Sequence, residues 1–335
     1  MIDLDAARGV GDPEADAIVT RLGRDVWITN RLLASIHRDD QALPPAIDPE
    51  LACLVVPELP PWADRHRIRR AQKFAHERLL FVTVALFCAS LPAGYCAMEG
   101  ARVLRMAGRM TGDLDRRINE TARFVIDVLT PGAFDAGGRA RVALGKVRLV
   151  HAAVRASLVA RGYPHVAVNQ EDQLGTLGLF SVVVSKSLVR LGVDVSARDR
   201  EDYFHLWRVA GAMMGVREEL LPQSCDDAEA LLFAIKARQN GPSEDGKALM
   251  AALLQGMEDH VKVPGLTQLP RGLVRYLLGA EMASWLGIEG GPAMGSTLDG
   301  LHVFQRLAPT LGKHLLDAVT FVKLGGERAT FAMPT

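Results

Sequence analysis

Two arginines and a histidine share one face of a predicted helix, and their side chains could hold an anionic or metal-containing ligand. Arg148, His151 and Arg155 stand at positions i, i+3 and i+7 within KVRLVHAAVR (146–155), and this spacing places them above one another on a helix. The intervening residues are almost all apolar, so we expect the face to be buried, where cations need partners. The three residues therefore line either an internal ion-pair network or a ligand pocket, and the pattern leaves both open.

Two glycines, Gly175 and Gly178, lie three residues apart in the next predicted helix, NQEDQLGTLGLFSVVVSK (169–186). Each glycine costs about 1 kcal/mol relative to alanine inside a helix, so something must approach the backbone closely there. A neighbouring helix or a planar cofactor would each explain the pair.

The start of the same helix carries Asn169, Glu171 and Asp172. Asn169 is a good N-cap, and carboxylates in the first turn favour the helix dipole. This interpretation is preferred to an acid/base or metal pair, although a non-haem metal enzyme that uses Glu171, Asp172 and a histidine stays a minor alternative.

A second histidine, His205, lies within DREDYFHLWRVAGAMMGV (199–216), next but one to Trp207. A single histidine on an apolar helix face is more often a hydrogen-bonded core residue than a ligand. We therefore predict the structural role for His205 and rank it second among the histidines that could bind a metal.

The elements that must position these residues are helices. Strand-like alternation is scarce and helical periodicity dominates, which predicts an all-α protein of about ten to twelve helices. The expected helices cover residues 13–36, 64–91, 97–110, 114–129, 138–161, 170–191, 200–214, 226–239, 246–260, 271–286 and 297–324.

Composition bounds the class of partner. The 335 residues include 49% hydrophobic residues, enough for a large core. Lys and Arg together number 39, as do Asp and Glu, so no overall charge favours nucleic acid. The four cysteines, Cys53, Cys88, Cys96 and Cys225, have no metal-ligand spacing. With an acidic N-terminus that lacks a signal-peptide pattern, they predict a cytoplasmic protein.

The uncharged run at 79–98 is long enough to cross a bilayer. Pro92 and Gly94 interrupt it, which favours a buried core helix that ends near Leu91, a turn at SLPAGY (90–95) and a new helix beyond. We therefore expect no membrane span.

Seven segments in order resemble the oxygenase family of MpaB and the bacterial latex clearing protein, or rubber oxygenase. The similarity runs over about 79–288. The segments are SLPAGY (90–95), GARVL (100–104), RINET (117–121), KVRLVHAAVR (146–155), NQED (169–172), YFHLWRVAGAMMGV (203–216) and RGLVRYLLGAEMASWLGI (271–288). The resemblance implies an all-helical domain with a globin-like core, haem b, and cleavage of carbon–carbon double bonds with O2.

For the site, the resemblance implies a haem pocket between the helices at 140–161 and 170–191. Arg148 and His151 would lie on its distal face or contact the propionates, Arg155 would pair with a propionate, and Gly175 and Gly178 would lie beside the porphyrin. The relatives' proximal histidine aligns with Gly178, and no histidine occurs between His165 and His205. Because axial ligands are normally His, Cys, Met or Tyr, we predict His151 as iron ligand, ahead of His205.

The expected function is therefore that of a haem-dependent oxygenase acting on a hydrophobic alkene or terpenoid-like small molecule with O2. The alternative is a family member without haem that binds a hydrophobic ligand or serves a structural role. The predicted organisation has an N-terminal helical arm with a Pro-rich connector (1–62), a helical core (63–290), and a C-terminal helix and tail (291–335).

Overall fold

The structure is a computed structural model that describes residues 2–22, 57–107, 114–260 and 268–289. In these ranges every regular element is a helix, and the one β-type backbone pairing joins Ala97 to Asn240. The predicted all-α class is confirmed. The predicted helix at 297–324, the end of the one at 13–36 and the C-terminal segment 291–335 lie outside the described residues.

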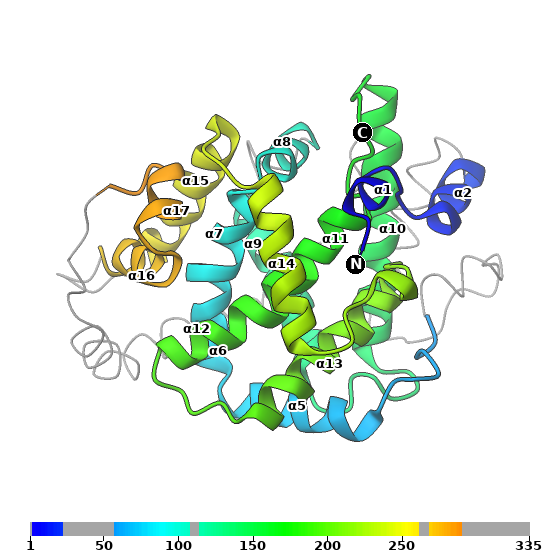
Figure 1. Cartoon of the computed structure of the whole chain (residues 1–335), viewed down its shortest axis with the longest axis horizontal. Coiled ribbons are helices and arrows are strands. Elements are labelled where there is room, and N and C mark those ends of the chain that lie inside the picture. The colour runs from blue at the N-terminus through cyan, green and yellow to red at the C-terminus, as the bar shows by residue number, and fades with distance from the viewer. Residues whose placement is uncertain (1, 23–56, 108–113, 261–267, 290–335) are drawn as a thin grey trace.

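The helices follow the chain in the order shown in Figure 1. The first group is α1 (Leu4–Arg8), α2 (Pro13–Leu22), α5 (Arg65–Glu77), α6 (Leu79–Ala85), the π-helical η1 (Leu86–Ser90), α7 (Leu91–Tyr95), α8 (Met98–Met106) and α9 (Leu114–Leu129). The second group is α10 (Arg139–Ala160), α11 (Gln170–Gly178), the π-helical η2 (Leu179–Val183), α12 (Val184–Arg190), α13 (Ala197–Met213), the 3₁₀ turn η3 (Glu218–Leu220), α14 (Cys225–Gln239), α15 (Glu244–His260), α16 (Leu269–Leu278) and α17 (Ala280–Trp285).

The helix predicted over 64–91 is broken at Arg78, where the chain bends by 88°. Beyond the bend the chain stays helical to Tyr95, past the predicted end near Leu91. The prediction of a turn at 90–95 is therefore wrong. The π-helical turn η1 precedes Pro92, which lies in the first turn of α7. Although Pro92 has no backbone N–H, the chain stays helical through η1 and α7 to Tyr95.

No single helix among the described residues is both long and apolar enough to span a membrane. The bent pair formed by Arg65–Glu77 and Leu79–Tyr95 meets the length and composition requirement jointly. Its second member is largely buried, with Val82, Ala85 and Ala89 in the main core, as expected for a core helix.

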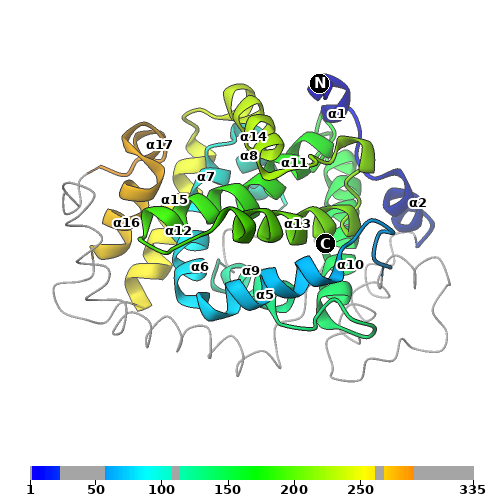
Figure 2. The ribbon, with the colours of Figure 1, turned by 60° about the horizontal axis from the view of Figure 1, so that its bottom comes forward.

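The main core lies among the central helices and contains the aromatic side chains of Phe124, Tyr203 and Trp207. Helix α13 runs along α5 on one side of it (Figure 2). A second apolar cluster joins α2 to α10, and α2 contributes Ala15 and Ile18 to it. These two clusters leave α10 in contact with both the central core and the N-terminal helices (Figure 1).

Candidate functional site

Helix α10 carries the three residues predicted to share one face, Arg148, His151 and Arg155, called here the cationic stripe. It runs for 22 residues and ends at Ala160; Arg161 is its C-cap, and the next residue, Gly162, has a φ of 75°. Such a left-handed glycine is a common helix terminator. Arg148 and Arg155 are both largely buried, and His151 is half-buried between them on the same face.

The guanidinium group of Arg148 binds two carboxylates from the N-terminal helices. Its Nε and Nη2 donate to the two oxygens of Asp12 at 2.6 and 2.9 Å, and Nη2 also donates to Glu14 at 2.6 Å. Burial lowers the pKa of Arg148, but the hydrogen bonds to Asp12 and Glu14 outweigh it and hold the pKa above its ordinary value. A bidentate arginine–carboxylate pair of this kind is among the strongest polar contacts in proteins.

Arg155 is held less completely. Its Nε donates to Asp16 at 2.7 Å and its Nη1 donates to the carbonyl of Val168 at 3.0 Å. The remaining nitrogen, Nη2, is buried and makes no hydrogen bond within the described part of the chain. Arg155 therefore keeps donor capacity for one more acceptor.

The ion-pair interpretation of the stripe is thus the one that the structure shows for Arg148 and Arg155. The acids that supply it, Asp12, Glu14 and Asp16, were not predicted from the sequence. A signal was present in GDPEAD (11–16), where Asp12 precedes a proline at the first helical position. Asp12 does cap α2, accepting from the backbone N–H of Ala15 at 3.2 Å.

Gln170, the first residue of α11, binds the same N-terminal segment. The backbone N–H of Gln170 donates to the carbonyl of Val10 at 2.9 Å. The side-chain amide of Gln170 donates to the carbonyls of Gly11 and Gly215 at 2.7 and 3.0 Å. The amide oxygen accepts from the backbone of Arg217 at 3.0 Å. Gln170 therefore joins the start of α11, the segment that follows α13 and the N-terminal segment at one point.

Glu171 is fully buried and is held by three side chains. It accepts from Arg8 at 3.1 Å, Arg238 at 2.9 Å and Gln239 at 2.9 Å. Asn169 caps the helix as predicted, accepting from the backbone of Asp172 at 3.0 Å. Within the described residues no group of three His, Cys, Asp or Glu side chains is placed to hold a metal ion.

The glycines of α11 face α14. A Cβ built on Gly175 would lie 3.4 Å from the side chain of Ile235, and one built on Gly178 would lie 3.0 Å from that of Leu232. Of the two explanations for the glycine pair, a close neighbouring helix is the one observed on this side. The π-turn η2 follows Gly178 directly, and such turns are frequent at functional sites.

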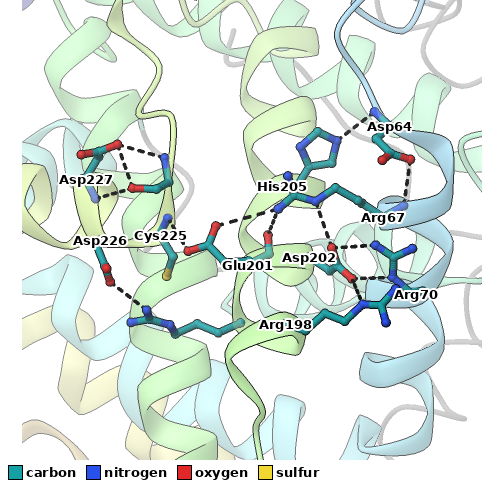
Figure 3. Close-up of polar contacts among 12 residues, drawn as sticks. Asp64, Arg67, Arg70, Arg198, Glu201, Asp202, His205, Cys225, Asp226 and Asp227 are labelled. Atoms are coloured by element: carbon teal, nitrogen blue, oxygen red, sulfur yellow. Dashed lines mark hydrogen bonds and ion pairs between the residues drawn. The ribbon is translucent and has the colours of Figure 1, made fainter.

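His205 is a buried, hydrogen-bonded core residue, as predicted (Figure 3). Its Nε2 accepts from the backbone N–H of Asp64 at 3.0 Å, at the start of α5. Burial, and then the charges of Arg67 and Arg208, lower the pKa of His205 to about 4. The imidazole is therefore neutral near pH 7, and the nitrogen that accepts from Asp64 is already engaged.

An ion-pair network surrounds His205 and joins α5 to α13 (Figure 3). Asp202, nearly fully buried, accepts from Arg67 at 2.9 Å and from Arg70 at 2.6 and 3.0 Å. Arg67 also donates to the carbonyl of Glu201 at 2.8 Å. This network is structural in form, because every contact in it joins protein groups of two packed helices.

Lys146 is a buried residue of α10 that the sequence analysis did not single out. Burial, and then the charge of Arg123, lower its pKa to about 7, while Asp127 acts in the opposite direction. Only Val147 separates it from Arg148 along the chain, which places the two side chains on opposite sides of the helix. It therefore does not extend the cationic stripe.

Comparison with known proteins gives three concordant matches. The family model described as ER-bound oxygenase mpaB/B'/Rubber oxygenase, catalytic domain, matches residues 77–312. A rubber oxygenase from Streptomyces sp. (strain K30) is 30% identical over 314 residues, which span 90% of this chain and 74% of that protein. The solved structure of latex clearing protein LCP in the closed state superimposes with a TM-score of 0.78 at 28% identity, covering 94% of this chain and 92% of the other.

Proposed function

Because this chain belongs to the family of mpaB-type and rubber oxygenases, we propose that it is an oxygenase acting on a hydrophobic substrate. O2 would be the co-substrate and haem b the cofactor. The observation that carries this proposal is the 30% identity to a rubber oxygenase across 90% of this chain, because a match of that extent includes the segments of α10, α11 and α13. The proposed compartment is the cytoplasm, since Cys88, Cys96 and Cys225 are buried free thiols.

The two arginines of α10 support the proposed haem site. A haem group needs cations for its two propionates, and Arg148 and Arg155 both hold carboxylates in this structure. The buried Nη2 of Arg155 has no hydrogen-bond partner in the described ranges, so a carboxylate there would satisfy it.

The axial position on α11 does not fit. Gly178 stands where the resemblance places a histidine, and Leu232 occupies the space beside it. The residue proposed to hold the iron is therefore His151 on α10, which lies between the two arginines in the sequence and on the same helix face. His205 ranks below it, because its Nε2 already accepts from Asp64.

When bound, the haem would supply the activation of O2. The residues of this chain would bind and orient it: Arg148 and Arg155 through its propionates, and His151 through the iron. The apolar surfaces of α10 and its neighbours would exclude water from the reaction.

Oxygen consumption tests the proposal. The protein, expressed with a haem precursor, is incubated with squalene, an apolar polyene, and with squalane, its saturated counterpart. We expect O2 uptake and carbonyl-containing fragments by mass spectrometry with squalene alone. Haem-loaded protein that consumes no O2 with squalene or with shorter terpenoid alkenes would contradict the proposed activity.

A second candidate function is favoured by the packing at Gly178. A family member without haem could use the same helices to bind an apolar ligand or to support another protein. Solvent extraction of the purified protein, followed by mass spectrometry and metal analysis, distinguishes the two. A stoichiometric apolar ligand without iron would favour this second function, whereas iron and protoporphyrin in equal amounts would exclude it.

A further inference from the structure

The two N-terminal helices, α1 and α2 with their connection (residues 2–22, called here the N-terminal pair), cover the cationic stripe of α10. Three carboxylates of the pair reach the two arginines: Asp12 and Glu14 bind Arg148, and Asp16 binds Arg155. The partners lie more than 130 residues apart in sequence. The pair therefore brings its own acids to the residues that the proposed function assigns to a ligand.

The position of Asp12 is shaped for a carboxylate. Its group lies against Gly215, which has a φ of 91°, and a Cβ on that glycine would come within 2.1 Å of the Asp12 oxygen and 2.8 Å of Arg148 Nε. Any side chain at position 215 would thus close the space. Arg148 and Gly215 together form a cradle that admits one planar carboxylate.

An apolar strip lies under the same pair. Ala15 and Ile18 of α2 belong to one cluster with Ala152, Val154 and Leu158 of α10. Beneath the N-terminal pair, α10 thus carries apolar side chains and two guanidinium groups. A flat apolar ligand with two carboxylates requires this combination of groups.

We propose that the N-terminal pair is an intramolecular occupant of a carboxylate-ligand site on α10, and that an apolar dicarboxylate such as a porphyrin displaces it. The inference rests on the proposed function, because it concerns the same arginines. Asp12 and Asp16 hold Arg148 and Arg155 in place of the two carboxylates of the ligand.

The exchange leaves no buried arginine without a counter-ion. Three carboxylates of the pair leave and the ligand brings two, one for each arginine, so Arg148 and Arg155 each keep a counter-ion in both states. At Arg155 a ligand carboxylate could accept two hydrogen bonds, whereas Asp16 accepts only from Nε. A carboxylate that accepts from both Nε and Nη2 would satisfy the nitrogen that has no partner in the described chain.

The test compares porphyrin affinities. Asp12→Asn combined with Asp16→Asn removes both charges from the pair, and asparagine at position 12 can still cap α2. Protoporphyrin IX, which has two carboxylates and no iron, should bind this double variant with a Kd about ten-fold lower than the unaltered protein. Its dimethyl ester, which lacks the carboxylates, should show no such gain.

Two control variants locate the effect. Asp5→Asn alters the contact of the pair with Arg238, away from α10, and should leave the affinity for protoporphyrin IX unchanged. Adding Arg148→Ala and Arg155→Ala to the double variant should remove the gain. Equal affinities for the unaltered protein and the double variant would overturn the inference while leaving the proposed haem site intact, whereas no porphyrin binding by any variant would overturn both.

A measurement on the unaltered protein avoids any loss of folding in the variants. Amide hydrogen exchange of residues 13–22 is followed with and without bound haemin. Displacement of the pair predicts that exchange in α2 becomes faster when haemin binds, while exchange in α13 stays slow. Haemin binding that leaves the exchange of α2 unchanged or slower would overturn the inference.

Discussion

Leu232 of α14 packs against Gly178 of α11, with its side chain 3.0 Å from the position that a Cβ on the glycine would take. One turn earlier, the corresponding distance from Gly175 to Ile235 is 3.4 Å, an ordinary van der Waals contact. Both glycines of α11 face α14, but a Cβ would have less space at Gly178 than at Gly175. At Gly178 any side chain would therefore require Leu232 to shift.

Alanine substitutions should therefore act differently at the two glycines. Gly175→Ala is expected to raise the free energy of unfolding by about 1 kcal/mol, because it removes the helical cost of glycine without a clash. Gly178→Ala should give no gain or a loss of about 1 kcal/mol, since Leu232 must shift. Urea unfolding of both variants measures this difference, and an equal gain at both positions would contradict the packing described.

Stability should fall in mild acid through His205. Its pKa is about 4 in the folded chain and 6.5 ordinarily, so below pH 6.5 the unfolded chain binds the proton first. The free energy of unfolding should decrease by about 3 kcal/mol as the pH falls from 6.5 to 4. His205→Gln keeps an acceptor for the N–H of Asp64 and removes the titration. Urea unfolding should therefore give a smaller acid loss in this variant, and parallel pH profiles would contradict the prediction.

Lys146 should make the protein more stable as the pH rises. Its pKa is about 7 in the folded chain and 10.5 ordinarily, so between these values the unfolded chain holds more protons and the free energy of unfolding increases with pH. Lys146→Met should raise that free energy by about 3 kcal/mol at neutral pH, because methionine needs no hydration. Lys73→Met, at an exposed position, serves as the control and should change it by less than about 0.5 kcal/mol.

In the ion-pair network between α5 and α13, substituting the central Asp202 should lower the free energy of unfolding more than substituting the exposed Arg198. Asp202→Asn removes the charge that Arg67 and Arg70 share, and is expected to cost about 2 kcal/mol. Arg198, 72% exposed and 3.9 Å from the same carboxylate, gives the matched control. Arg198→Ala should cost no more than about 0.5 kcal/mol. Thermal unfolding of both variants measures the loss of stability. Equal losses in Asp202→Asn and Arg198→Ala would contradict this prediction.

Local patterns were sufficient to predict most of the helices. The expected helix at 138–161 is observed at Arg139–Ala160, because its ends carry glycine and its interior is apolar. The N-cap at Asn169 and the core role of His205 also followed from neighbouring residues. The bend at Arg78 was missed, because no glycine or proline marks it and the two arms are fixed by packing against different helices.

The partners of the cationic stripe could not be predicted in the same way. The apolar neighbours of Arg148 and Arg155 predicted a buried face, which is correct, but left open whether the arginines join an ion-pair network or line a ligand pocket. Which groups would pair with them depends on a contact between segments 136 residues apart, and helical periodicity carries no information at that range. The structure supplied the acids, on which the proposed competition between the N-terminal pair and a ligand rests.

The absorption spectrum of the purified protein, expressed with a haem precursor, tests the central claim most directly. The account predicts a Soret band that is lost or shifted in His151→Ala and unchanged in His165→Ala, whose imidazole is exposed on a loop. Protein that is colourless and takes up no added haemin would contradict it.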